Sequence, residues 1–207
     1  NISYPATLPS AAANMKAFAQ VSGTAYERFG IKFASVCFQD DLTLKYYDPP
    51  PGSGAFDSND AKWVGAAFAG GPNYTWTAPA PAAAFADNTK YNIRVLAEDL
   101  AGNPMGAQSA TVIRFDTAEP VARPVTPADG SFLKELASVA GTASDPNSDP
   151  SGVSGTQIRI QRGDGQYWTG SAWGSDTWLG AVAGNNWTKA SQLPPSDNSV
   201  GLQDGLL

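Results

Sequence analysis

Short runs in which apolar residues alternate with polar ones recur along the whole chain. A period of two is expected of a β-strand that buries one face. In the two clearest runs the apolar positions are Val36 and Phe38, and then Tyr91, Ile93 and Val95. The segment 99–103 (DLAGN) predicts a tight turn into a further strand at 111–115. Only 80–86 looks helical, and Pro81 limits it to about one turn. The pattern predicts an all-β sandwich.

The two halves of the chain carry the same pattern in the same order. Residues 15–25 match residues 133–143 at a constant offset of 118 positions, including a Gly-Thr-Ala turn. Further matches follow with loops of different length between them, which is typical of a duplicated domain. They are Val36 and Phe38 with Ile158 and Ile160, Tyr46-Tyr47 with Tyr167-Trp168, Phe56 with Trp173, Trp63 to Ala66 with Trp178 to Ala181, and Asn73 to Thr75 with Asn186 to Thr188.

A stiff, proline-rich segment marks the boundary between the two halves. Residues 116–120 (DTAEP) follow the last strand of the first half, and Pro124 and Pro127 come soon after. We therefore place the first domain at residues 1–118 and the second at residues 119–207.

The second domain is expected to be incomplete at its C-terminal end. Aligning Asp87 with Asp204 leaves no counterpart for the first domain's strands at 91–99 and 108–115. We expect the second sandwich to lack these last two strands and to expose a bare sheet edge. Such an edge favours pairing with another chain, including an edge-to-edge homodimer.

The amino-acid composition excludes several common classes of catalytic site. Histidine is absent, which excludes His-based triads and His-ligated zinc. The single cysteine, Cys37, aligns with Arg159 off the predicted core face, so we expect an exposed thiol without a partner. Glycosidases need two carboxylates across a cleft, whereas neighbours such as Glu98 and Asp99 point to opposite faces of a strand. We expect no enzyme activity.

Charge and hydropathy narrow the range of partners. The chain has 13 basic and 19 acidic residues, a net charge of −6, and no cluster of lysine or arginine. Nucleic acid is therefore not an expected partner. No run of 18 apolar residues occurs, so no membrane insertion of this segment is predicted.

Several short motifs resemble the bacterial immunoglobulin-like domains of large secreted and cell-surface proteins. They are VSGTA, VAGTASDPNSDPSGV, YNIRVLAEDLAGN and FDTAEP, and the run YWTGSAWGSDTWLGAVAGNNWT resembles a variant with a Trp-decorated hairpin. The resemblance implies two tandem immunoglobulin-like sandwiches. It also implies a structural or adhesive spacer at the cell surface or outside the cell, without catalytic residues, whose partners are neighbouring domains of a longer chain.

Tryptophans suggest an alternative function as a carbohydrate-binding module. Flat indoles can stack on sugar rings, and Trp168 and Trp173 lie in a Gly/Ser-rich hairpin where they are candidates for such contact. They could instead pack within the hairpin. Trp63, Trp178 and Trp187 occupy repeated positions, which favours a place in the core or in hairpin packing.

The tripeptide Arg162-Gly163-Asp164 is a second candidate for binding, here to a host surface protein. An extended loop could present its arginine and aspartate to an integrin. The alternative interpretation is ordinary turn chemistry at Gly163-Asp164-Gly165.

Calcium is the one cofactor that the acidic excess suggests. Calcium takes six to eight oxygen ligands and can rigidify loops of extracellular domains. Asp145 and Asp149 lie in one loop, and Asp116 and Glu119 lie near the domain boundary. No DxDxDG loop is present, and solvated carboxylates explain these residues equally well.

Overall fold

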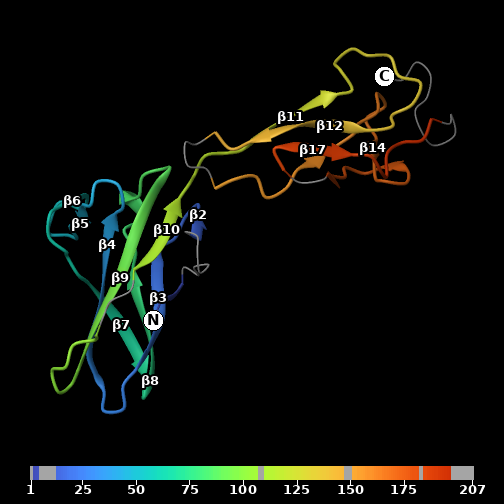
Figure 1. Cartoon of the computed structure of the whole chain (residues 1–207). Helices are drawn as coiled ribbons and strands as arrows, with labels where there is room; N and C mark the ends of the chain where they lie inside the picture. The colour runs from blue at the N-terminus through green and yellow to red at the C-terminus, as the bar shows by residue number, and fades with distance from the viewer. Residues whose placement is uncertain (1, 5–12, 107–109, 147–150, 182–183, 197–207) are drawn as a thin grey trace. The chain divides into compact units, whose positions relative to one another are not determined.

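The computed structural model describes residues 2–4, 13–106, 110–146, 151–181 and 184–196. The chain divides into two compact units, Asn1–Ala118 and Glu119–Leu207, at the residue where the sequence places the boundary (Figure 1). Nearly all regular structure in both units is β-strand. The all-β sandwich-type fold that the alternation predicts is therefore confirmed.

The described part of the first unit contains ten strands and one short 3-10 turn, and that turn lies within the segment predicted to be helical. The elements are β1 (Ile2–Tyr4), β2 (Ala13–Met15), β3 (Gln20–Tyr26), β4 (Ile31–Asp40), β5 (Tyr46–Tyr47), β6 (Phe56–Ser58), β7 (Val64–Gly70), β8 (Asn73–Pro79), η1 (Ala82–Ala84), β9 (Thr89–Asp99) and β10 (Thr111–Phe115).

These strands form one curled sheet in the order β1-β3-β8-β7-β4-β9-β10-β2. Strand β7 connects the two halves of this curled sheet, since residues 64–66 pair with β4 and residues 67–70 pair with β8. Strand β2 runs parallel to β10, and all other pairs are antiparallel. Hairpin β5–β6 continues from β4 through the pair Gln39 and Tyr46.

The core of the first unit lies inside this curl. Its alternating strand positions are buried as predicted, and Val36, Phe38 and Ile93 are fully enclosed. Phe85, just after η1, packs among five other rings and is 8% exposed. Those rings belong to Phe18, Phe38, Phe56, Tyr91 and Phe115.

The outer face of β4 is covered as well, which contradicts the exposed thiol expected at Cys37. Cys37 is 1% exposed and Gln39 is 8% exposed. The side-chain amide of Gln39 donates to the carbonyl of Leu44, in the turn that leads into β5. Burial raises the pKa of the Cys37 thiol to about 11, although the positive charge of Arg94 opposes this rise. Cys37 is therefore a buried and weakly acidic thiol.

The second unit contains seven strands in its described part. They are β11 (Val121–Thr126), β12 (Val139–Ser144), β13 (Gln157–Ile158), β14 (Tyr167–Trp168), β15 (Trp173–Gly174), β16 (Leu179–Gly180) and β17 (Asn186–Lys189). They pair as β11-β12-β17, β13-β16 and β14-β15. A separate core forms between them from Ala143, Ile158, Trp168, Leu179 and Trp187.

Two strand pairs repeat with the register that the sequence alignment implies. Val36 pairs with Val64 in the first unit, and Ile158 pairs with Leu179 in the second. Tyr47 likewise faces Phe56, and their counterparts are Trp168 and Trp173. The duplication thus extends to individual residue pairs.

A third strand pairing shows that the sequence alignment of the two units is wrong by two residues at Trp187. Gly23 faces Trp76, and its repeat partner Gly141 faces Trp187. Both tryptophans are buried. Trp187 is therefore the counterpart of Trp76 rather than of Tyr74, and Lys189 takes the place of the core residue Ala78.

In the described part of the second unit no strand follows β17. Residues 197–207, which include Asp204, lie outside the described residues, so the prediction that the last two strands are missing stays a prediction.

Candidate functional site

The structure places Trp168 in the core, which contradicts its predicted contact with a ligand. Trp168 is 2% exposed, and its indole N–H donates to the carbonyl of Gln192 at 2.7 Å. Trp173 meets it edge-on, with ring centroids 5.4 Å apart, and is half-buried. The reason is the register: Trp168 takes the inward position that Tyr47 takes in the first unit. An enclosed ring cannot stack on a sugar at the surface.

Trp178, for which the repeat favoured a place in the core or in hairpin packing, is 54% exposed. The residue after it, Leu179, is 7% exposed and faces the core. Trp178 comes directly before β16, and neighbouring side chains of an extended segment face opposite ways, so Trp178 faces outward while Leu179 faces the core. The repeat does not distinguish these two adjacent apolar residues.

Trp178 belongs to a cluster on the outer face, here called the Arg159 cluster, that also contains Arg159, Tyr167 and Asp176. The Arg159 guanidinium lies over both rings, 5.0 Å from the centroid of Tyr167 and 4.9 Å from that of Trp178. It also donates to Asp176 at 3.0 Å. Cations over aromatic faces are stabilising, so the cluster holds an exposed indole in a fixed position beside polar groups.

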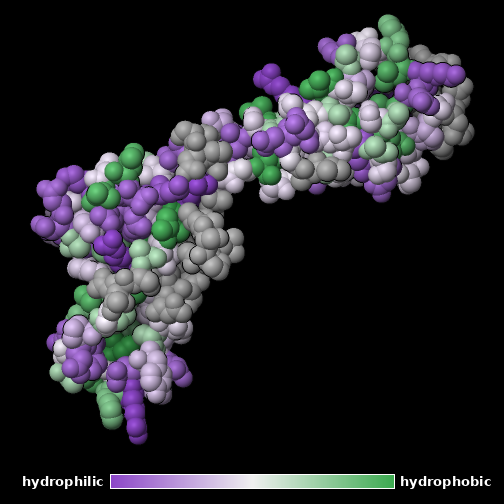
Figure 2. Space-filling view, in the orientation of Figure 1, coloured by the Kyte–Doolittle hydropathy of each residue, from purple (hydrophilic) through white to green (hydrophobic). Residues whose placement is uncertain are grey.

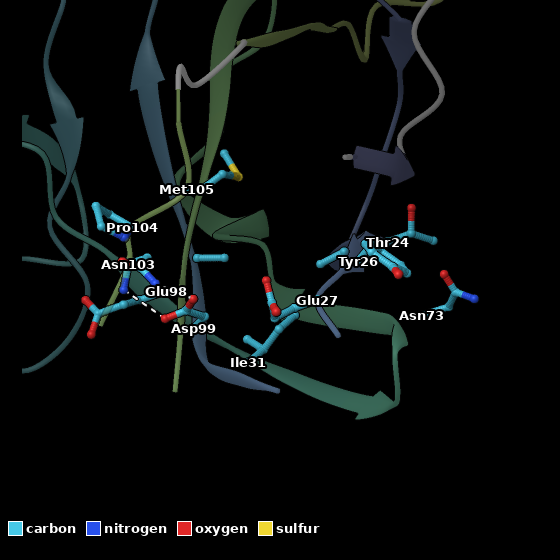
Figure 3. Close-up of a pocket in the computed structure, with 12 residues that line it drawn as sticks. Thr24, Tyr26, Glu27, Ile31, Asn73, Glu98, Asp99, Asn103, Pro104 and Met105 are labelled. Atoms are coloured by element: carbon cyan, nitrogen blue, oxygen red, sulfur yellow. Dashed lines mark hydrogen bonds between the residues drawn. The ribbon is translucent and has the colours of Figure 1, made fainter. Parts of the chain in front are cut away.

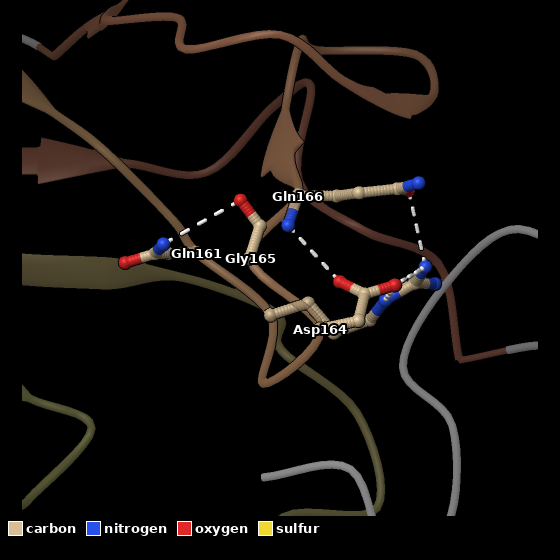
Figure 4. A network of polar contacts seen from close by, with 5 residues as sticks. Gln161, Asp164, Gly165 and Gln166 are labelled. Atoms are coloured by element: carbon tan, nitrogen blue, oxygen red, sulfur yellow. Dashed lines mark hydrogen bonds and ion pairs between the residues drawn. The ribbon is translucent and has the colours of Figure 1, made fainter.

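The Arg-Gly-Asp tripeptide forms a closed turn (Figure 4). Gly165 N–H donates to the Arg162 carbonyl, and Arg162 N–H donates to the Gln166 carbonyl, both at 2.9 Å. The guanidinium of Arg162 donates to the Asp164 carboxylate, whose other oxygen accepts from the N–H of Gln166. Arg162 also lies 4.8 Å from the ring centroid of Trp173.

These contacts tie the two charges of the tripeptide to each other. The hydrogen bond from Arg162, followed by that from Gln166, lowers the pKa of Asp164 below its ordinary value. Gly163 and Asp164 lie at the exposed tip. The geometry fits turn chemistry, and it does not hold Arg162 and Asp164 apart for a partner.

The calcium candidates do not come together among the described residues. One Asp145 oxygen accepts from the Ser151 hydroxyl at 3.1 Å and from the Gly152 N–H at 2.9 Å. Asp149 lies outside the described residues. Asp116 is buried and caps the N–H of Ala118 at 3.2 Å, and Glu119 is exposed in the other unit. Within the described ranges no group of three or more possible ligands of the His, Cys, Asp or Glu type is arranged around one point.

A hollow of about 660 Å³ at one end of the first unit was not predicted (Figure 3). Its walls come from β3, β4, β8 and β9 and from the loop after β9. Glu98 pairs with Lys32 at 2.5 Å, and Asp99 accepts two hydrogen bonds from Asn103 at 2.8 Å. Glu98 and Asp99 both line the hollow, where each carboxylate has its own partner.

No helix in the described residues is long and apolar enough to cross a membrane. Comparisons of the chain with protein-family models, with curated proteins and with solved structures returned no match.

Proposed function

We propose that the chain is a non-catalytic structural or adhesive spacer, built from two tandem immunoglobulin-like sandwiches, in a bacterial extracellular or cell-surface protein. One observation carries this proposal: two units with separate cores repeat one set of strand registers. Domains with their own cores can fold alone. Repeating such a domain lengthens a chain in regular steps, which suits a spacer.

The strand order of the first unit supports the immunoglobulin-like part of the proposal. In that fold, strands A, B, E and D form one sheet and strands C, F and G form the other. The order β1-β3-β8-β7 matches the first sheet, and β4-β9-β10 matches the second.

Stretching single molecules held at both ends tests the spacer. The two units are expected to unfold in separate steps, because each has its own core. At ~3.5 Å per extended residue, the larger step releases at most about 410 Å and the smaller about 310 Å. An extension without force steps would contradict a load-bearing spacer.

The exposure of Trp178 favours carbohydrate binding by the Arg159 cluster as a second candidate function. Arg159 covers one face of the indole, yet half of the residue remains accessible. This surface offers stacking on a sugar ring, hydrogen bonds donated by Arg159 and hydrogen bonds accepted by Asp176. A host receptor bound through Arg162 and Asp164 has no comparable support, because those charges pair with each other.

A glycan array probed with the whole chain tests this second function. Replacing Trp178 with alanine should weaken any capture about tenfold or more, a loss of ~1.4 kcal/mol. The matched control is Trp63→Ala, at the repeated position in the first unit, which should leave capture unchanged. If no glycan is captured, or if both variants behave alike, the Arg159 cluster is not a sugar site.

A further inference from the structure

We infer that the hollow at one end of the first unit binds an aliphatic primary amine, with its methylene chain against the apolar wall and its ammonium group between Glu27 and Asp99. This site lies beyond the proposed spacer function and does not depend on it. It belongs to the first unit, whereas the Arg159 cluster belongs to the second.

Two rows of inward-facing side chains, one on β3 and one on β9, lead into the hollow. Inward positions on a strand recur at every second residue. They are Val21, Gly23, Ala25 and Glu27 along and just after β3, and Ile93, Val95, Ala97 and Asp99 along β9. Each row changes from core residues to an alanine and then to a carboxylate, and both alanines and both carboxylates line the hollow.

The small alanine side chains leave this end of the core open. Ala25, Ala97 and Met105 pack against the core but stay partly exposed, and Ile31 beside them is 8% exposed. All four line the hollow, so part of its wall is apolar. Figure 2 shows hydrophobic surface between hydrophilic side chains at the end of the first unit that carries the β3–β4 and β9–β10 loops. A volume of about 660 Å³ is that of a small-molecule site.

Backbone hydrogen bonds hold both sides of the hollow in place. The Glu27 N–H donates to the carbonyl of Pro72 at 3.0 Å, which ties the end of β3 to the β7–β8 turn. On the other side, the Met105 N–H donates to the carbonyl of Ala97 at 2.7 Å, so the loop after β9 folds back along the strand. A ligand therefore meets walls that are already formed.

The carboxylates of Glu27 and Asp99 lie on opposite sides of the hollow (Figure 3). Glu27 accepts from the N–H of Phe29 at 3.1 Å, and Asp99 accepts from the backbone and side-chain N–H groups of Asn103 at 2.8 Å. These donors are neutral. The hydrogen bonds from Asn103 lower the pKa of Asp99, so this group stays charged at neutral pH. No lysine or arginine lines the hollow in the described part of the first unit.

This combination of an apolar wall and two carboxylates favours an amine over other ligands. An ammonium group donates three hydrogen bonds, and its positive charge offsets the repulsion between Glu27 and Asp99. A neutral alcohol would gain the apolar contact without the charge. A calcium ion needs six or more oxygen ligands and would leave the apolar wall unused. A free aliphatic amine and the side chain of a partner's lysine share the chemistry that fits.

Ligand-observed NMR with hexylammonium chloride and the whole chain at neutral pH tests the inference. We expect saturable binding, and hexanol, of the same length but neutral, should bind about 5-fold more weakly. Glu27→Gln keeps an acceptor for the Phe29 N–H and should weaken hexylammonium binding about 3- to 10-fold. The matched control is Asp60→Asn, at an exposed carboxylate of the same unit outside the hollow, which should leave binding unchanged.

A filled hollow separates this site from simple ion pairing at the surface. Ala97→Leu adds three carbons on the inward face of β9 and should abolish hexylammonium binding while both carboxylates remain. Hydrogen exchange checks that this variant is folded, and Glu27→Gln keeps the inference testable if it is not.

Nα-acetyl-lysine amide distinguishes the two sources of the amine. If it binds as tightly as hexylammonium, a lysine side chain is the occupant, and if it binds more weakly, a free amine is. Equal binding of hexanol and hexylammonium, unchanged binding in Glu27→Gln, or no saturable binding would overturn the inference. So would displacement of hexylammonium by an equal concentration of calcium, because the carboxylates would then serve a metal ion.

Discussion

Replacing Gly141 with alanine is expected to unfold the second unit well below the melting temperature of the native chain while the first unit stays folded. A Cβ at Gly141 would lie 2.1 Å from the carbonyl oxygen of Arg123 and 2.3 Å from the Trp187 ring. The oxygen is backbone and cannot rotate away. The added methyl group must therefore push β11 or β17 away from β12, at a cost of about 3 kcal/mol.

Hydrogen exchange during chemical denaturation measures this loss unit by unit. Gly180→Ala is the matched control, because Gly180 lies in β16 of the same unit and a Cβ there would meet nothing within 4 Å. Its effect should remain within about 0.5 kcal/mol. Equal destabilisation by both variants would show that the loss of glycine itself, and not the close approach of Arg123 and Trp187, is responsible.

The parts of the fold that could be predicted from sequence are those with a local signature. Alternation identified the buried faces at Val36 and at Ile93, because a strand with one buried face repeats every two residues. The repeat added the pairing of Ile158 with Leu179, since duplicated strands keep their neighbours.

The failures arose where burial depends on distant segments. Cys37 is enclosed because the region around β5 and Arg94 covers the outer face of β4, which alternation in β4 does not reveal. The two-residue error at Trp187 came from matching Asn-X-Thr tripeptides, whereas packing opposite a glycine decides the register. The Arg159 cluster likewise combines three separate segments.

Phe85 illustrates the same limit, and its replacement by alanine is expected to destabilise the first unit by about 4 kcal/mol. It follows a single 3-10 turn and has no periodicity to reveal it. Nevertheless its ring stacks on the ring of Phe18, with centroids 4.8 Å apart, and meets the ring of Tyr91 edge-on, with centroids 4.7 Å apart. The Tyr91 hydroxyl, in turn, accepts from the N–H of Ala86 at 2.8 Å and holds the segment in place.

Removing the Phe85 ring leaves a cavity that its neighbours cannot fill without leaving their strands, because most of them lie on paired strands. Denaturant unfolding followed by hydrogen exchange should show the loss in the first unit only, since the second has its own core. Phe85→Leu keeps much of the volume and should cost clearly less. Phe29→Ala, at a ring that is 79% exposed, should change stability by no more than about 0.5 kcal/mol. If Phe85→Ala destabilised the first unit as little as Phe29→Ala does, the contacts of Phe85 with its five neighbouring rings would not be the centre of this core. The paired strands alone would then hold the sandwich together.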